Sequence, residues 1–165
     1  MKHTEESKTT FKYFGQYNLW AGKRIRALVS KLTKKELNEK VGAKTARGLS
    51  EHIVLALETC FYIADESSDR TVFEAVEKYS MDDLLGRWAR LDTRLSKIIA
   101  EIPQGKIMVP HLTDNPFEMD VLDFYLQYLF HNTHHRGQLV MTLRALGKEI
   151  PGTDYLMFFA ENPPG

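Results

Sequence analysis

Three of the six histidines stand together near the end of a long apolar-periodic segment, in the run Phe130-His131-Asn132-Thr133-His134-His135-Arg136-Gly137-Gln138. On an α-helix, residues four apart lie one turn apart on nearly the same face, so the imidazoles of His131 and His135 can face one point. A divalent metal ion at roughly 2.0–2.1 Å from each ring nitrogen would fit between them. Two ligands are too few for a tight site, so a metal centre needs a third ligand from elsewhere in the chain.

The spacing leaves alternatives open. His134 is also one turn from His131, at a separation of three residues, so geometry alone does not decide whether His134 or His135 turns inward. A histidine pair on a helix can also be a solvated surface feature, since histidine is often exposed. From the residues alone, both interpretations stand.

Residues 131–138 resemble the signature of the DinB/YfiT-like metal-binding four-helix proteins, and the similarity extends over most of the chain, about residues 13–159. In those proteins both outer histidines of the motif are metal ligands. The resemblance therefore implies that His131 and His135 bind a metal ion and that His134 does not.

The resemblance also implies a third ligand, a histidine early in the second helix, and His52 is the candidate at that place. An isolated histidine beside an apolar stripe is more often a boundary residue of the core, but pairing with the downstream motif favours the ligand role. Gln138, one turn beyond His135, could orient a ligand or water, or pack between helices. Trp20 could line the metal pocket, although core packing is the simpler role. We expect Arg136 to serve the structure or a dimer interface.

Three neutral histidine ligands leave the ion its full charge and a coordination position open, which is typical of catalytic zinc sites. Such an ion can lower the pKa of a bound water to about 7 or favour a thiolate. Imidazole suits several divalent ions, among which we expect zinc or nickel. Cys60, the single cysteine, lies eight residues after His52, roughly 12 Å along a helix, so the two cannot share an ion. It is expected to be a small core residue.

The resemblance implies a metal-dependent enzyme, and we expect one that activates a low-molecular-weight thiol for transfer to a small-molecule substrate. A metal-dependent hydrolase and a non-catalytic metal-binding stress protein are the alternatives. A DNA-linked stress protein is a further possibility, against which the zero net charge and the lack of a base-reading motif argue. A continuous basic stripe on the surface would favour it.

Length and composition predict one soluble globular domain over residues 1–165. Residues 1–50 carry twelve Lys and Arg against four Asp and Glu, so opposite charges could meet within the fold or across a dimer. No apolar run is long enough to span a membrane, and no signal peptide is evident. One cysteine fits a reducing cytoplasm. We expect a homodimer, because the apolar segment 155–159 offers surface to bury and similar proteins commonly pair through bundle helices.

Apolar periodicity predicts an all-α four-helix bundle with helices at about 10–32, 47–66, 80–103 and from 116–120 to 147. A hairpin or irregular crossover is expected at 104–119, before the last long helix. Thr33 should cap a short helical turn that Gly42 ends, and Gly147 should end the last long helix. Residues 155–159 should form a short helix on the bundle or on a partner subunit.

Overall fold

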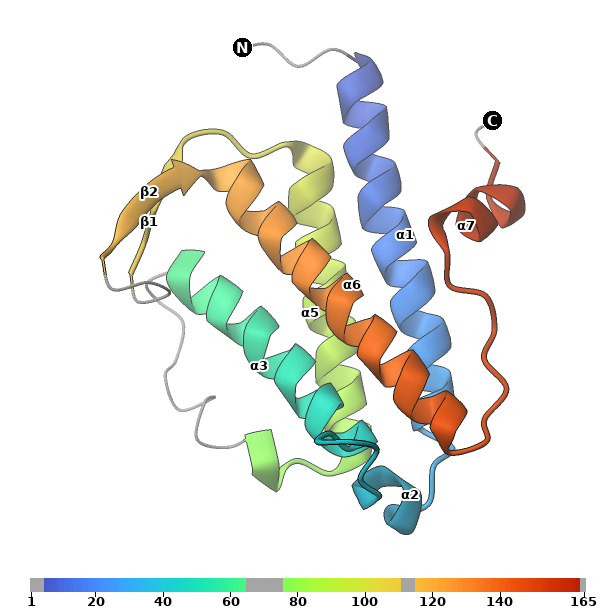
Figure 1. Ribbon diagram of the computed structural model, residues 1–165. Coiled ribbons are helices and arrows are strands. Elements are labelled where there is room, and N and C mark those ends of the chain that lie inside the picture. Colours follow the sequence, from blue (N-terminus) through green and yellow to red (C-terminus); the bar gives the residue numbers. More distant parts are fainter. Residues whose placement is uncertain (1–4, 65–75, 111–114, 164–165) are drawn as a thin grey trace.

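The chain folds into a helical bundle, which the computed structural model describes for residues 5–64, 76–110 and 115–163 (Figure 1). Four long helices form it: α1 (Glu5–Val29), α3 (Ala46–Ala64), α5 (Met81–Glu101) and α6 (Val121–Ala145). Short elements complete the described part: α2 (Lys34–Asn38), the 3-10 turn η1 (Val76–Lys78), the strands β1 (Lys106–Val109) and β2 (Phe117–Asp120), and α7 (Tyr155–Glu161). The predicted all-α four-helix bundle is confirmed.

The helices pack with α1 mainly against α5, while α3 contacts both α5 and α6. In Figure 1, α3 and α6 lie side by side and run in opposite directions. The crossover between α5 and α6 is a hairpin in which Ile107 lies opposite Met119 and Val109 lies opposite Phe117. Because β2 leads directly into α6, the hairpin sets where the histidine-bearing helix begins.

The starts of α3 and α5 lie within one residue of the predicted ones, whereas α1 begins at Glu5 and not at about residue 10; the cap expected at Thr33 is present. Thr33 and Glu36 form a reciprocal capping box at the start of α2. At the start of α5, the Ser80 side chain accepts a hydrogen bond from the backbone N–H of Asp83. These caps satisfy backbone donors that the first helical turn leaves without partners.

The two glycines expected to end helices differ in outcome. Gly147 follows α6 with φ of 73°, and the next N–H, of Lys148, donates to the Leu143 carbonyl, a C-terminal motif that needs left-handed backbone. The prediction for Gly42 is wrong, because α2 already ends at Asn38. Gly42 instead turns the chain within the isolated bridge between Val41 and Lys44.

Two glycines allow α1 to approach α5 closely. A Cβ added at Gly15 would lie 2.7 Å from the carbonyl oxygen of Ser96, and one added at Gly22 would lie 2.5 Å from Oδ2 of Asp92. Both distances are shorter than real Cβ contacts. The tight α1–α5 contact therefore depends on the missing side chains at these positions.

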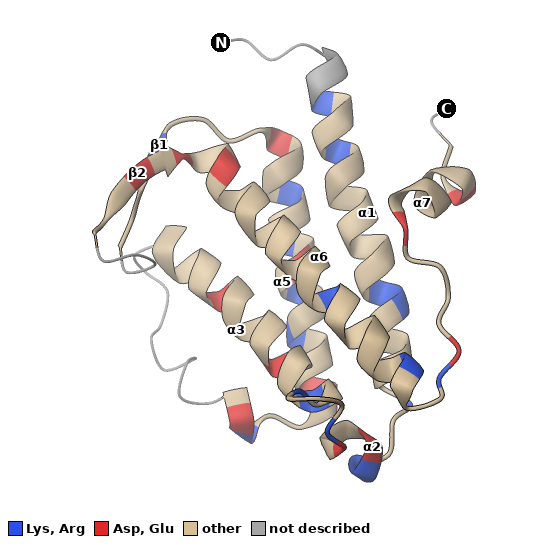
Figure 2. Ribbon diagram, viewed as in Figure 1, with Lys and Arg blue, Asp and Glu red and all other residues tan. Residues whose placement is uncertain are grey.

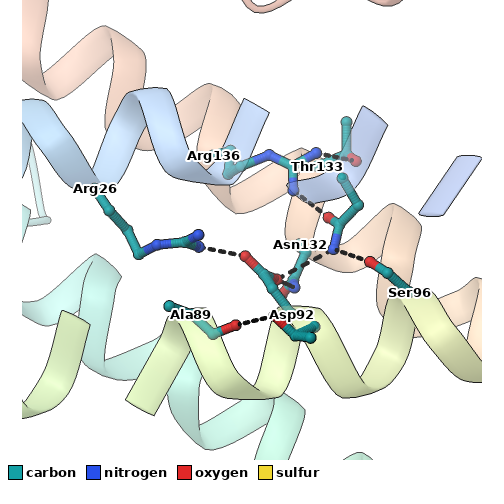
Figure 3. Close-up of polar contacts among 9 residues, drawn as sticks. Arg26, Ala89, Asp92, Ser96, Asn132, Thr133 and Arg136 are labelled. Carbon is teal, nitrogen blue, oxygen red and sulfur yellow. Dashed lines mark hydrogen bonds and ion pairs between the residues drawn. The ribbon is translucent and has the colours of Figure 1, made fainter. Parts of the chain in front are cut away.

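A buried polar cluster fills this close contact, and Figure 3 shows its side chains converging from α1, α5 and α6. Asp92 of α5 is fully buried and is ion-paired with Arg26 of α1. Its Oδ1 accepts hydrogen bonds from Nδ2 of Asn18 and Nδ2 of Asn132, each 3.2 Å long. Arg136 of α6, also buried, donates to Oδ1 of Asn18. We call these five residues the Asp92 cluster.

Burial raises the pKa of the Asp92 carboxyl and lowers the pKa of the Arg136 guanidinium, while their opposite charges counteract both shifts. Removing one member of such a buried cluster leaves an uncompensated charge, at a cost of about 3–5 kcal/mol. The Asp92 cluster therefore disfavours any rotation of α1, α5 or α6 that separates these charges from their partners.

The C-terminal helix α7 lies on the bundle itself. Phe158 is buried, and the ring of Tyr155 meets that of Tyr17 of α1 edge-on at 5.1 Å between centroids. Glu161 is ion-paired with Arg24 of α1. Residues 155–159 were expected to pack either on the bundle or on a partner subunit, and the structure shows them on the bundle.

Charges from the basic first part of the chain pair with acids from later elements, as the ion pairs of Arg24 and Arg26 show. In Figure 2 the charges coloured on α1 are all Lys and Arg, whereas Asp and Glu gather near the hairpin. The opposite charges therefore meet within the fold. No helix in the described ranges is both long and apolar enough to cross a membrane.

We predict that Gly22→Ala lowers the free energy of unfolding by about 1–3 kcal/mol, because the added methyl group would overpack against Asp92 and Arg26. Gly137→Ala is the matched control, since a Cβ there meets nothing within 4 Å and alanine favours the helix by up to about 1 kcal/mol. Urea denaturation of both variants checks this. Equal stabilities of the two variants would contradict the close contact.

Candidate metal centre

The three histidines named from the sequence lie together where α3 faces α6. His52 is in the second turn of α3, and His131 and His135 stand one turn apart in the middle of α6. Each offers one ring nitrogen, and these three atoms lie within 4.8 Å of one another. Nε2 of His52 lies 3.0 Å from Nε2 of His135. His134 is exposed and is not part of the group.

The rotation of α6 explains which histidines turn toward α3. Consecutive helical residues are about 100° apart around the axis, so neighbours in sequence project from different sides. Asn132 and Arg136 are held in the Asp92 cluster on the side of α1 and α5. His131 and His135 each precede one of these two residues and lie on the side of α3.

Exposure of the three rings increases from His135, which is buried, through His131 to His52, which is exposed. The group therefore has one side in the bundle and one side open to solvent. Burial, and then the charge of the neighbouring histidines, lower the pKa values of His52 and His131. Burial also lowers the pKa of His135. The lowered pKa values favour neutral imidazoles, the form that metal binding requires.

One ligand candidate has a partner for its second nitrogen. Nδ1 of His135 lies 2.9 Å from Oε1 of Gln138, and Nε2 of Gln138 lies 2.9 Å from Nε2 of His134. Histidine ligands in metal sites commonly donate their outer N–H in this way. Of the two roles considered for Gln138, its side-chain contacts favour orientation of a ligand.

The donor set fits a divalent transition metal. Nitrogens of a tetrahedral ion at about 2.0–2.1 Å stand roughly 3.4 Å apart, close to the separation between His52 and His135. Only imidazoles belong to the group, which suits zinc or nickel better than magnesium or calcium. Cys60 is fully buried, and burial raises the pKa of its thiol, so it is a core residue.

Trp20 lies apart from the three histidines, at the contact between α1 and α7. Its ring meets that of Phe158 edge-on, its Nε1 donates to Oε2 of Glu161, and the Arg24 guanidinium covers it at 4.2 Å. These contacts give Trp20 the role of holding α7 on α1. These contacts do not support the position of Trp20 in a metal pocket that the sequence suggested.

Sequence reasoning missed Asp92 and Asn18, whose contacts fix the rotation of α6. A signal exists: Asp92 falls between Trp88 and Leu95 on the apolar face of its helix, where a carboxylate needs buried partners. Arg136, assigned to structure or to a dimer interface, lies in the buried cluster, so its role is structural.

The class of protein defined by these features is a four-helix bundle with a three-histidine group between two antiparallel helices. The family model of the DinB family matches residues 5–164, nearly the whole chain. The chain belongs to the DinB family. A comparison with curated proteins finds no match.

We predict that the metal-free protein loses stability as the pH falls through about 6.5, the ordinary histidine value. The lowered pKa values mean that the unfolded state binds more protons in this range, so the free energy of unfolding decreases with acidification. Below the pKa values of the folded state, both states are fully protonated at these histidines, and the free energy of unfolding stops decreasing on their account. Urea titrations between pH 5 and 8 with a chelator present measure the slope, and His131→Gln should make it shallower. An unchanged slope in this variant would contradict the lowered pKa of His131.

Proposed function

We propose that His52, His131 and His135 bind one divalent metal ion, zinc or nickel, and that the protein is a metal-dependent enzyme. The observation that carries the proposal is the approach of three imidazole nitrogens to within 4.8 Å of one another, from helices far apart in sequence. Membership of the DinB family and the open side at His52 support it.

The reaction best supported is transfer of a low-molecular-weight thiol to a small electrophilic molecule. A bound cation supplies the charge that lowers the pKa of a thiol or a water molecule beside it. The three histidines are neutral, so they leave that charge undiminished. His135 and His131 close the inner side of the site with their rings, and His52 borders the side that substrates can reach.

Neither Cys60 nor Thr59, both on the helix that carries His52, offers a competing nucleophile. Cys60 is buried and its thiol is held protonated, and the hydroxyl of Thr59 donates to the backbone of its own helix. The nucleophile is therefore proposed to come from solution. Water in place of the thiol would make the protein a hydrolase, and a metal-binding protein without catalysis is the remaining alternative.

Metal binding is tested by titrating the purified apoprotein with Zn²⁺ and Ni²⁺ and measuring bound ion per chain. We predict one ion for the natural protein and strongly reduced binding after alanine replaces His52, His131 or His135, with helical content retained. His134→Ala is the matched control and should still bind one ion at saturating metal. Retained binding in all three ligand variants would contradict the proposal.

Catalysis is tested with a panel of small electrophiles, with and without added thiol. We predict turnover that chelation abolishes, that metal restores, and that Cys60→Ala leaves largely intact. Dependence on thiol identifies the transferase, and thiol-independent, metal-dependent hydrolysis identifies the hydrolase. Absence of metal-dependent turnover across the panel would favour the non-catalytic role.

We further propose that the protein acts in the cytoplasm as a homodimer, paired through the outer face of α6. On this face Phe130 and Met141 are 58% and 62% exposed, three turns apart, and apolar side chains are typical of the core of such interfaces. Light scattering should give a dimer at micromolar concentration, and Phe130→Glu should shift it to monomer. A monomeric natural protein would contradict this pairing.

A further inference from the structure

We propose that Gln138 is a positioning residue, which holds His135 as its Nδ1–H tautomer, and that His134 in turn orients the Gln138 amide. The Nε2 lone pair of His135 is thereby directed toward the other two histidines. The consequence for metal affinity rests on the proposed metal site, whereas the tautomer itself is a property of the metal-free chain.

The donor and acceptor chemistry of the amide carries this assignment. Oε1 of Gln138 can only accept a hydrogen bond, so Nδ1 of His135, at 2.9 Å, must be the donor. Nε2 of Gln138 can only donate, so Nε2 of His134, at 2.9 Å, must be the acceptor. A flipped amide would instead place Nε2 of Gln138 against Nδ1 of His135 and would require the Nε2–H tautomer of His135, which has no Nε2 lone pair to offer an ion. The orientation in the structure, with Oε1 toward His135, is therefore the one that is consistent with the proposed metal site.

Helix geometry delivers both contacts from one side chain. Gln138 follows His135 by three residues and His134 by four, which are the two spacings that bring side chains together on a helix. The backbone carbonyl of Gln138 also accepts a hydrogen bond from the Thr142 hydroxyl, at 3.1 Å. The amide thus spans from a buried ring to an exposed one.

The tautomer matters because a neutral imidazole offers a lone pair on only one nitrogen. Nε2 of His135 is the atom that lies 3.0 Å from Nε2 of His52. With the proton on Nδ1, Nε2 of His135 accepts from His52 without a metal and is available to an ion. With the proton on Nε2 of His135, that lone pair is absent. A metal ion could then bind at Nε2 only after the proton had moved to Nδ1.

This reasoning gives His134 a role although it lies outside the ligand group. An exposed acceptor at the far end of the amide stabilises the orientation in which Oε1 faces His135. Loss of a partner that orients a metal ligand typically costs roughly 10–100-fold in affinity. We expect a loss in this range for removal of Gln138 and a smaller loss for removal of His134.

The experiment combines two readouts on ¹⁵N-labelled protein. Long-range ¹H–¹⁵N correlation spectra of the chelator-treated apoprotein at pH 7.5 report the tautomer of each histidine. Competition with a chromophoric chelator gives the Zn²⁺ affinity. The variants are Gln138→Met, which removes both hydrogen bonds at similar size, Gln138→Glu, which keeps an acceptor for His135, and His134→Ala. Gln127→Met, at an exposed glutamine of the same helix, is the matched control.

The expected result is an Nδ1–H proton on His135 in the natural protein and in Gln138→Glu, and its loss in Gln138→Met together with the affinity loss. Helical content and the control variant should be unchanged. An Nδ1–H proton that persists in Gln138→Met, or an equal affinity loss in Gln138→Met and Gln138→Glu, would overturn the inference. If the natural protein binds no Zn²⁺, the proposed function fails, and the tautomer spectra still decide the role of Gln138.

Discussion

A carboxylate with no exposure to water must keep its hydrogen-bond donors, and those of Asp92 come from two other helices. Arg26 and Asn18 reach it from α1, and Asn132 reaches it from α6. A turn of α6 by one residue, about 100°, would remove Asn132 and Arg136 from the cluster and leave buried charge without partners. Because this rotation is fixed, the side chains immediately before these two residues, His131 and His135, lie on the side of α3.

The bundle thus separates two polar groups on adjacent sides of one helix. The charged groups of the Asp92 cluster, which are its carboxylate and both guanidinium groups, find partners within the protein, whereas the buried Oδ1 of Asn132 has none. The histidine group is open on the side of His52, and the lowered pKa values of its three rings favour the neutral form. The first group fixes how the helices pack, and the second is the proposed metal site. Gly22, together with Gly15, allows the close approach of α1 to α5 in which Arg26 is ion-paired with Asp92.

Much of the fold followed from local signals. Apolar periodicity, the cap at Thr33 and the glycine at 147 are properties of neighbouring residues, and they predicted the helices. The exception at Gly42 arose because a bridge between Val41 and Lys44, not a helix end, uses its left-handed backbone. The choice between His134 and His135 was not decided by spacing. It depends on contacts of α6 with Asn18 and Asp92, which are distant in sequence, so only resemblance to a family could supply it beforehand.

The central claim is that three imidazoles of this bundle hold one divalent ion, and X-ray absorption spectroscopy of the protein loaded with one equivalent of Zn²⁺ tests it most directly. The account predicts a shell of nitrogen or oxygen atoms at about 2.0–2.1 Å, with the outer-shell scattering of three imidazole rings and without sulfur at about 2.3 Å. Replacement of His131 by alanine should reduce the ring contribution from three to two. A sulfur shell, or a shell without imidazole scattering, would contradict the account.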